Sequence, residues 1–164
     1  MRYANDMITA IRQEIRLRKQ DAKVPVETIY FGGGTPSVLS PTQLRLLLDE
    51  VNSSFSVVAD PEITLEANPD DLSPDYIHGL KNLGFNRLSI GVQSFLDDEL
   101  TLMNRAHNAS QALSSVKHAK KEFDNVSIDL LFGNPNTTLD DWKRNLDYAL
   151  QLEVPHISSY ALTL

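Results

Sequence analysis

The feature that most constrains the fold of this chain is a regular alternation of amphipathic and β-rich segments. Apolar residues at helical spacing and helix-start signals predict helices near residues 4–19, 40–51, 73–84 and 138–150, and a helical region between the strand that ends near residue 94 and residue 123. Short β-rich segments predict strands at about residues 28–31, 62–67, 86–94, 126–133 and 156–164. Helices that alternate with strands are typical of a parallel sheet with crossover helices, so we expect an α/β fold.

The predicted helices have well-marked first residues. Ser40 is an expected N-cap, with Pro41 at the first helical position and Gln43 placed to complete a capping box. Ser73 and Thr138 are expected to cap two later helices. We also expect the long helical region to break near residues 108–110. The last helix is expected to carry the apolar residues Trp142, Leu146, Ala149 and Leu150.

Alternation along each strand divides its side chains between two faces. One set is apolar and is expected to pack under the helices: Ile29, Phe31, Ile63, Leu65, Ala67, Leu88, Ile90, Val92, Ile128, Leu130 and Phe132. The other set places Glu66, Gln93 and Asp129 near the C-terminal ends of three successive strands. Polar groups on a parallel sheet, whose faces are normally buried, need partners or a ligand. A buried polar network, with Glu66 or Asp129 paired to Arg105, is the alternative to a binding site. We expect the Arg105 guanidinium to face the same cleft and to pair with an acidic group when no ligand is bound.

The segment YFGGGTPS, residues 30–37, places three glycines between a predicted strand and a predicted helix. Such a loop is where α/β proteins bind ligands, and glycines let backbone N–H and C=O groups approach a ligand closely. The segment matches neither GxGxxG nor a P-loop, and a tight strand-to-helix turn would also explain it. Beside three polar strand ends, however, it predicts a binding site at the C-terminal edge of the sheet.

Composition argues against several classes of function. The 164 residues carry a net charge of −7, which disfavours nucleic acid or an anionic membrane as the main partner. There is no cysteine, so this chain has no disulfide, thiolate metal site or cysteine nucleophile. No apolar run approaches the roughly 18 residues of a membrane span, and no signal-peptide core is present, so we expect a cytoplasmic protein. Four histidines without metal-ligand spacing are expected at the surface or in packing: His78, His107, His118 and His156.

Six sequence blocks follow one another along nearly the whole chain: TIYFGGGTPSVLS (28–40), LEANPDDLS (65–73), NRLSIGVQSF (86–95), NRAH (104–107), SIDLLFGNP (127–135) and HISSYALTL (156–164). The series resembles the radical S-adenosylmethionine (radical SAM) enzymes of the oxygen-independent coproporphyrinogen III oxidase type, which include haem-chaperone relatives. GVQSF and the ending YALTL are more similar to the haem-chaperone branch than to the dedicated oxidase.

The resemblance implies a parallel (β/α)6 partial barrel of the TIM type, with S-adenosylmethionine across the C-terminal ends of its strands. Carried over position by position, eight residues would bind this cofactor: Gly33, Gly34, Thr35, Glu66, Gln93, Arg105, Asp129 and Ala161. The glycine loop and Thr35 would hold the amino end of the methionyl group. Arg105 would be the natural partner of its carboxylate, and Glu66 or Asp129 would accept from amine or hydroxyl groups. Ala161 would line the adenosine side.

The sequence departs from the family pattern in two places. The usual Gly-Leu-Pro-Gly-Gln-Thr after the fifth strand appears as GNPNTT (133–138), so Asn134 and Thr137 replace an apolar residue and a glutamine. The Cys-x-x-x-Cys-x-x-Cys that holds a [4Fe–4S] cluster in the family is absent. We therefore expect residues 1–164 to be the central part of a radical SAM partial barrel, a fragment lacking the first strand, the cluster loop and the C-terminal domain.

For the parent protein, the resemblance implies S-adenosylmethionine and a [4Fe–4S] cluster as cofactors, an electron donor for the cluster, and a 5′-deoxyadenosyl radical. In the oxidase interpretation, the radical drives oxidative decarboxylation of a porphyrinogen in haem biosynthesis. The competing interpretation is a haem chaperone that binds haem and transfers it. A third interpretation is an unrelated (β/α) domain whose glycine loop binds phosphate. The cysteine-free chain by itself is expected to be inactive, with no catalytic residue and no metal ligand of its own.

Overall fold

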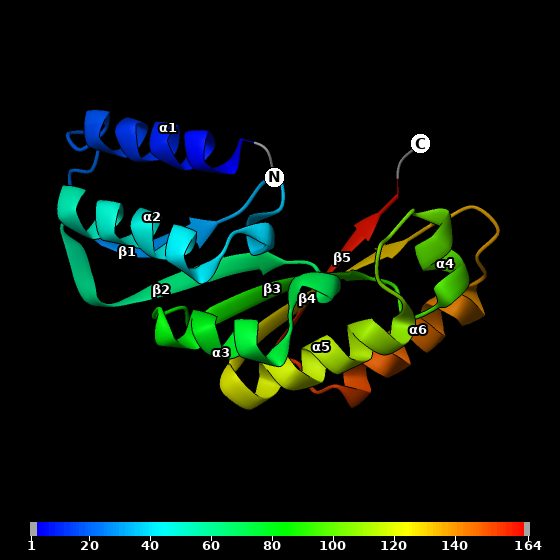
Figure 1. The fold of residues 1–164 in the computed structure, drawn as a ribbon. Helices are drawn as coiled ribbons and strands as arrows, with labels where there is room; N and C mark the ends of the chain where they lie inside the picture. Colours follow the sequence, from blue (N-terminus) through cyan, green and yellow to red (C-terminus); the bar gives the residue numbers. More distant parts are fainter. Residues whose placement is uncertain (1–2, 163–164) are drawn as a thin grey trace.

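The computed structural model describes residues 3–162. Within these residues, one sheet contains five parallel strands, which lie side by side in the order in which they occur in the sequence. The strands are β1 Val26–Phe31, β2 Val57–Ala67, β3 Arg87–Gln93, β4 Asn125–Phe132 and β5 His156–Ala161. Each strand pairs in parallel with the next one along the chain. The sheet curls into a half-barrel flanked by helices (Figure 1). The predicted α/β fold, a parallel partial barrel of the TIM type, is therefore confirmed.

Within the same residues, six α-helices accompany the strands: α1 Ala4–Leu17, α2 Pro41–Ser54, α3 Pro74–Asn82, α4 Asp97–Leu102, α5 Ala109–Glu122 and α6 Leu139–Gln151. Two short 3-10 helices, η1 Pro36–Val38 and η2 Pro69–Asp71, follow β1 and β2. Ser40 and Thr138 form capping boxes, and Ser73 caps α3, as predicted. The predicted break is also confirmed, because Asn108 caps a new helix, α5.

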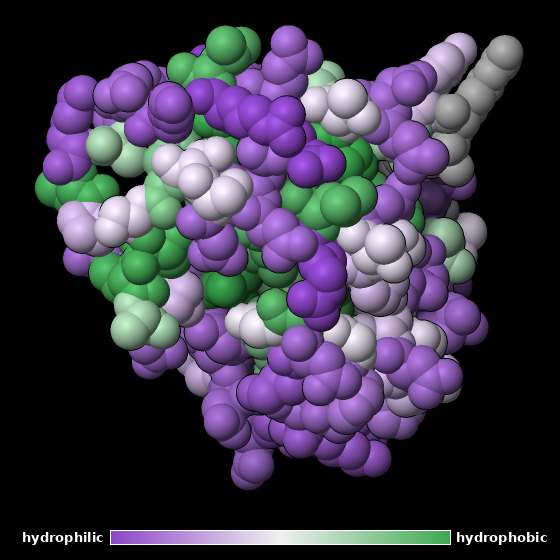
Figure 2. All heavy atoms as spheres, turned by 60° about the vertical axis from the view of Figure 1, so that its left-hand side comes forward, coloured by the Kyte–Doolittle hydropathy of each residue, from purple (hydrophilic) through white to green (hydrophobic). Residues whose placement is uncertain are grey.

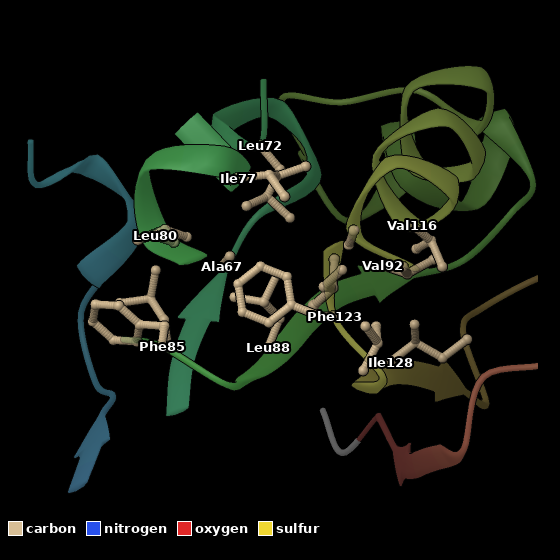
Figure 3. Close-up of a cluster of buried hydrophobic side chains, with 14 of the residues drawn as sticks. Ala67, Leu72, Ile77, Leu80, Phe85, Leu88, Val92, Val116, Phe123 and Ile128 are labelled. Atoms are coloured by element: carbon tan, nitrogen blue, oxygen red, sulfur yellow. The ribbon is translucent and has the colours of Figure 1, made fainter. Parts of the chain in front are cut away.

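The hydrophobic core lies between the sheet and the helices. Leu88 and Ile128, which belong to the predicted apolar face of the strands, are fully buried. Figure 3 shows them in one cluster with Leu80 from α3, Val116 from α5 and Phe123. Because the apolar side chains face the helices, the polar set of strand side chains is left on the inner face of the half-barrel.

Strand β2 is longer than predicted. It begins at Val57 rather than near residue 62, and it passes through Pro61. The pairing register between β1 and β2 shifts between Val26 and Thr28, opposite this part of β2. Such an irregularity accommodates proline, which has no N–H to donate to a neighbouring strand.

Phe132, which was expected to pack under the helices, and the apolar Leu150 of α6 both lie at the surface. Phe132, at the end of β4, is 40% exposed, and its ring packs against Trp142 with a centroid distance of 5.4 Å. Leu150 is 66% exposed, whereas its neighbour Ala149 is fully buried. Successive helical residues are about 100° apart around the axis, so Leu150 lies beyond the edge of the buried stripe of α6.

A buried polar network joins the end of β3 to two helices. Ser94, Glu99 of α4 and Asn145 of α6 are each at most 6% exposed. The Ser94 hydroxyl donates to Glu99 Oε2 at 2.6 Å, and Asn145 Nδ2 donates to the same oxygen at 3.0 Å. Asn145 Oδ1 accepts from the N–H of Phe95 at 2.6 Å. The network therefore connects the end of β3 and the nearby α4 to α6, with Ser94 and Asn145 separated by 51 residues in the sequence.

Helix α1 packs on α2 at the β1 side of the sheet. Glu50 of α2 accepts from Arg12 and from Arg16 of α1, and the hydrogen bond with Arg16 lowers the pKa of the Glu50 carboxyl. Figure 2 brings this side forward and shows apolar residues in patches separated by polar residues. No helix in the described part of the chain is both long and apolar enough to cross a membrane.

Candidate functional site

A cavity of about 140 Å³ lies at the C-terminal ends of β2, β3 and β4, beside the glycine loop that follows β1. Six of the eight predicted binding residues line it: Gly34, Thr35, Glu66, Gln93, Arg105 and Asp129. The expectation that Glu66, Gln93 and Asp129 share one side of the sheet is therefore confirmed as a matter of geometry. A larger cleft of about 590 Å³ lies between α4 and α6, and it includes none of the eight residues.

Glu66 connects β2 to the glycine loop. Its Oε1 accepts from the Tyr30 hydroxyl at 2.7 Å, and its Oε2 accepts from the Gly33 N–H at 3.0 Å. Partial burial, together with the hydrogen bond to Glu66, raises the pKa of Tyr30 to about 12, so the hydroxyl keeps its proton at neutral pH. A Cβ on Gly32 would lie 2.6 Å from the Tyr30 ring and 3.0 Å from the Glu66 carboxyl group. A larger residue at position 32 would therefore have to displace the Tyr30–Glu66 pair.

Ser37 holds the other end of the glycine loop. Its hydroxyl donates to Asp71 Oδ2 at 2.6 Å and accepts from the Asn68 N–H at 3.3 Å. Ser37 is only 4% exposed, so the loop after β1 is fixed to the loop after β2 through buried contacts. A fixed loop can present its backbone groups to a ligand without a large ordering cost.

Arg105, in the segment between α4 and α5, reaches the cavity but does not pair with an acidic residue. Its Nη2 donates to Asn68 Oδ1 at 2.6 Å and to the Gly91 carbonyl oxygen at 3.2 Å. The expected ion pair between Arg105 and Glu66 or Asp129 is therefore wrong. Neutral acceptors take up the two hydrogens of Nη2, and Nη1 and Nε have no hydrogen-bond acceptor among the described residues.

The acidic side chains of the site also lack a cationic partner. Among residues 3–162, neither Glu66 nor Asp129 forms a salt bridge. Burial raises the pKa of Asp129, and the nearby charge of Glu66 raises it further, although a hydrogen bond with Ser158 opposes this effect. Two carboxylates in one cavity favour a ligand that carries positive charge or hydrogen-bond donors.

We expect Asp129→Asn to raise the melting temperature of the ligand-free chain at pH 7. The folded-state pKa of Asp129 lies above 3.8, so its stabilising contribution is present below pH 3.8 and is lost as the pH rises through the folded pKa. Because asparagine does not ionise, the Asp129→Asn variant should not lose this stability as the pH rises. Melting curves from pH 3 to 8 would test this, with the exposed Asp147→Asn as the matched control. An unchanged midpoint at pH 7 would contradict it.

Two predicted residues lie outside the lining of the cavity. Gly33 borders it through its hydrogen bond to Glu66, whereas Ala161 lies at the end of β5, paired with Phe132 of β4. Sequence reasoning did not single out Tyr30 and Asn68, which contact Glu66 and Arg105. Tyr30 lies in β1, and Asn68 directly follows β2, two residues after Glu66. The alternation that identified Glu66 was therefore also the signal for them.

The divergent loop at residues 133–138 contains a buried amide without partners. Asn134 is 4% exposed, and neither its Oδ1 nor its Nδ2 has a hydrogen-bond partner among the described residues. Its backbone carbonyl is satisfied, because it accepts from the N–H and the hydroxyl of Thr137. The side chain therefore carries a desolvation cost that an apolar residue would not.

We expect Asn134→Leu to increase the free energy of unfolding by about 1–2 kcal/mol, because it removes two unsatisfied polar atoms and buries a side chain of similar size. Urea denaturation would measure the change. Asn136→Leu is the matched control in the same loop: Asn136 has a φ of 65°, which leucine tolerates poorly, so that variant should be less stable. Equal or lower stability of Asn134→Leu would show that the amide is satisfied in solution.

Comparisons with known proteins identify the family of this chain. The sequence profile of the Radical SAM superfamily matches residues 6–149. The chain is 39% identical over 161 residues to the haem chaperone HemW of Bacillus subtilis, a match that covers 96% of this chain and 42% of that protein. It is 36% identical over 159 residues to HemW of Mycobacterium tuberculosis H37Rv, covering 96% of this chain and 41% of the relative.

The chain is also similar to a solved structure of a radical SAM enzyme. Coproporphyrinogen III oxidase (HemN) from Escherichia coli, described as a radical SAM enzyme, matches with a TM-score of 0.90 and 31% identity. That match covers 98% of this chain and 37% of HemN, so the chain spans less than half the length of the relatives it matches. The profile match, the identities and the fold agree, and the chain belongs to the radical SAM superfamily.

Proposed function

We propose that the cavity binds the methionyl end of S-adenosylmethionine. Arg105 has unused N–H groups, and Glu66 and Asp129 have no cationic partner in the described structure. An α-amino acid carries a carboxylate and an ammonium group, so it would give each of these side chains a partner of opposite charge. This charge pattern is the observation that supports the cofactor proposal.

The glycine loop has room for the amino end of the ligand. Gly33 and Gly34 have φ values of 74° and 44°, and a Cβ added to either would meet nothing within 4 Å. The space beside these residues, which side chains would otherwise fill, leaves backbone groups accessible. In the proposal, the backbone of Gly33 and Gly34 and the hydroxyl of Thr35 contact the amino end.

The remainder of the cofactor would extend beyond the cavity. A pocket that encloses a drug-sized ligand is roughly 300–1,000 Å³, and this cavity is only about 140 Å³. It therefore fits the amino-acid end rather than the whole molecule. We place the adenosine along the strand ends toward β5, where Ala161 is the proposed contact.

When bound together, S-adenosylmethionine and a [4Fe–4S] cluster supply 5′-deoxyadenosyl radical chemistry in this family. The residues of this chain do not fit the cluster, because none of them is a cysteine. We propose that residues 1–164 are the central part of a radical SAM barrel, and that other segments of the protein hold the cluster and meet its electron donor.

For the whole protein, the proposed function is that of a haem chaperone with radical SAM cofactors. The similarity to HemW proteins across 96% of the chain supports it. The second candidate is an oxidase acting on a porphyrinogen, and the TM-score of 0.90 with HemN favours it. Both candidates use the same cofactor cavity, so the cavity alone does not discriminate between them.

The test uses the full-length protein, reconstituted anaerobically with iron and sulfide. Calorimetry would measure S-adenosylmethionine affinity, absorbance would follow haem binding and its transfer to apo-myoglobin, and carbon dioxide release would report on coproporphyrinogen III. We expect cofactor binding, haem binding and transfer, and no carbon dioxide. Carbon dioxide release would select the oxidase, and affinity for phosphate without affinity for S-adenosylmethionine would overturn the cofactor proposal.

A matched pair of variants links the result to the cavity. Glu66→Gln keeps the size of the side chain but removes its charge, so it should weaken S-adenosylmethionine binding. Glu27→Gln, on the exposed surface of β1, makes the same change away from the cavity and should leave the affinity unchanged. Equal affinities of the two variants would show that the cofactor binds elsewhere.

A further inference from the structure

The backbone makes a tight turn where β3 ends. Gln93 has a φ of 65°, a left-handed conformation that is uncommon for residues other than glycine. The Ser94 N–H donates to the Val92 carbonyl oxygen at 2.8 Å, so Gln93 is the middle residue of a three-residue turn. A turn of this size with positive φ at its centre is rare and strained. It persists only where the surrounding structure holds it.

The turn directs Gln93 into the cavity. Pairing between β3 and β4 is irregular between Ile90 and Gln93, and the Gln93 side chain lines the cavity. A Cβ at residue 91 would lie 2.9 Å from Gln93 Nε2, so Gly91 leaves the space that this amide occupies. The position of the amide therefore depends on the geometry of the turn.

His107 holds the carbonyl group on which the turn closes. Its side chain is fully buried, and its Nε2 lies 3.0 Å from the Val92 carbonyl oxygen. A carbonyl oxygen can only accept, so Nε2 carries the hydrogen and donates. Burial lowers the pKa of His107, which favours the neutral ring. Nδ1 is then an acceptor, 3.6 Å from Asp70 Oδ1 and without a hydrogen-bond partner among the described residues.

The same short segment fixes Arg105. Arg105 donates to the Gly91 carbonyl oxygen, and His107 donates to that of Val92, so two successive carbonyls of β3 anchor the segment between α4 and α5. Ser94 and His107 share the Val92 oxygen, which links the turn to this anchor. In the NRAH block (104–107), the Arg105 side chain thus faces the cavity, whereas the His107 side chain is buried outside its lining.

We infer that His107 is a positioning residue for the cofactor cavity: by holding the Val92 carbonyl, it sets the turn that places Gln93 and the segment that carries Arg105. The inference rests on the proposed function, in which Gln93 and Arg105 contact S-adenosylmethionine. His107 itself does not line the cavity, and it acts through these two residues.

The test compares His107→Leu, which removes the donor, with His107→Gln, whose Nε2 can donate in its place. In the full-length protein, His107→Leu should weaken S-adenosylmethionine binding about fivefold to tenfold, as expected for the loss of one hydrogen bond. His107→Gln should restore most of the affinity. His118→Leu, on α5, is the matched control and should bind as the wild type does.

Two further measurements separate positioning from general stability. In a double-mutant cycle, His107→Leu should cost less affinity in a Gln93→Ala background than in the wild type, because only its effect through Arg105 then remains. Hydrogen exchange of the Ser94 amide should be faster in His107→Leu and near normal in His107→Gln. This exchange can be measured without any cofactor.

The outcomes are distinguishable. Wild-type affinity in His107→Leu, combined with a loss in Gln93→Ala, would overturn the inference and leave the proposed function intact. If the wild-type protein fails to bind S-adenosylmethionine, the proposed function is wrong, and with it the cofactor role of His107. Unchanged Ser94 exchange in His107→Leu would overturn the structural step by itself, whatever the binding result.

Discussion

Replacing Asn145 with leucine is expected to lower the free energy of unfolding of this chain by about 3–5 kcal/mol. Asn145 is completely buried, and its amide satisfies Glu99 Oε2 and the N–H of Phe95. Leucine would leave the buried N–H of Phe95 without its side-chain acceptor, and it would leave Glu99 Oε2 with the Ser94 hydroxyl as its remaining donor. Each such loss costs about 1–3 kcal/mol, more where a group is charged. The side chains are similar in size, so packing contributes little to the expected change.

Urea denaturation followed by circular dichroism would measure this effect. Asn52→Leu, at an exposed position of α2, is the matched control and should change the stability by less than about 0.5 kcal/mol. A double variant, Glu99→Leu with Asn145→Leu, should recover part of the loss, because it removes both side chains of the pair. Equal midpoints for Asn145→Leu and Asn52→Leu would show that water satisfies the network.

Local sequence signals were sufficient to predict the elements and the side of the sheet that holds the site. The caps at Ser40 and Thr138 depend on residues within one turn of a helix, so their geometry is encoded locally. The placement of Glu66 and Asp129 follows from strand alternation, which needs only the strand and its parallel neighbours. The alternation of side chains along the strands therefore predicts, without any tertiary contact, that these residues lie on the same side of the sheet.

Contacts between distant segments could not be predicted in the same way. Ser94 and Asn145 are 51 residues apart, and nothing local to either indicates that they meet. Arg105 was expected to pair with a carboxylate, because opposite charges attract, but the structure offers it Asn68 and a backbone carbonyl instead. The turn at Gln93 could not be predicted from the residue type, because glutamine rarely adopts a positive φ.

Replacing Arg105 with alanine in the full-length, cluster-loaded protein is expected to weaken S-adenosylmethionine binding by roughly 1.5–3 kcal/mol, the range for a hydrogen bond to a charged group. That loss is about a tenfold to 150-fold higher Kd. The expectation follows from the contacts of Arg105, because its neutral partners leave a positive charge for the ligand carboxylate. Calorimetry would measure the affinity, with Arg144→Ala, an exposed arginine of α6, as the matched control.

The contacts of Arg105 also define what would refute this role. Arg105 supports Asn68 and Gly91 as well as facing the cavity, so a purely structural role would lower the melting temperature without changing the affinity of the remaining folded protein. Arg105→Lys separates the two possibilities, because lysine keeps the charge but loses the planar fork that can bind a carboxylate and Asn68 together. If Arg105 binds the ligand, lysine should give an affinity between those of arginine and alanine. Unchanged affinity in Arg105→Ala would assign Arg105 to the support of β3 and leave Glu66 and Asp129 as the charged contacts of the site.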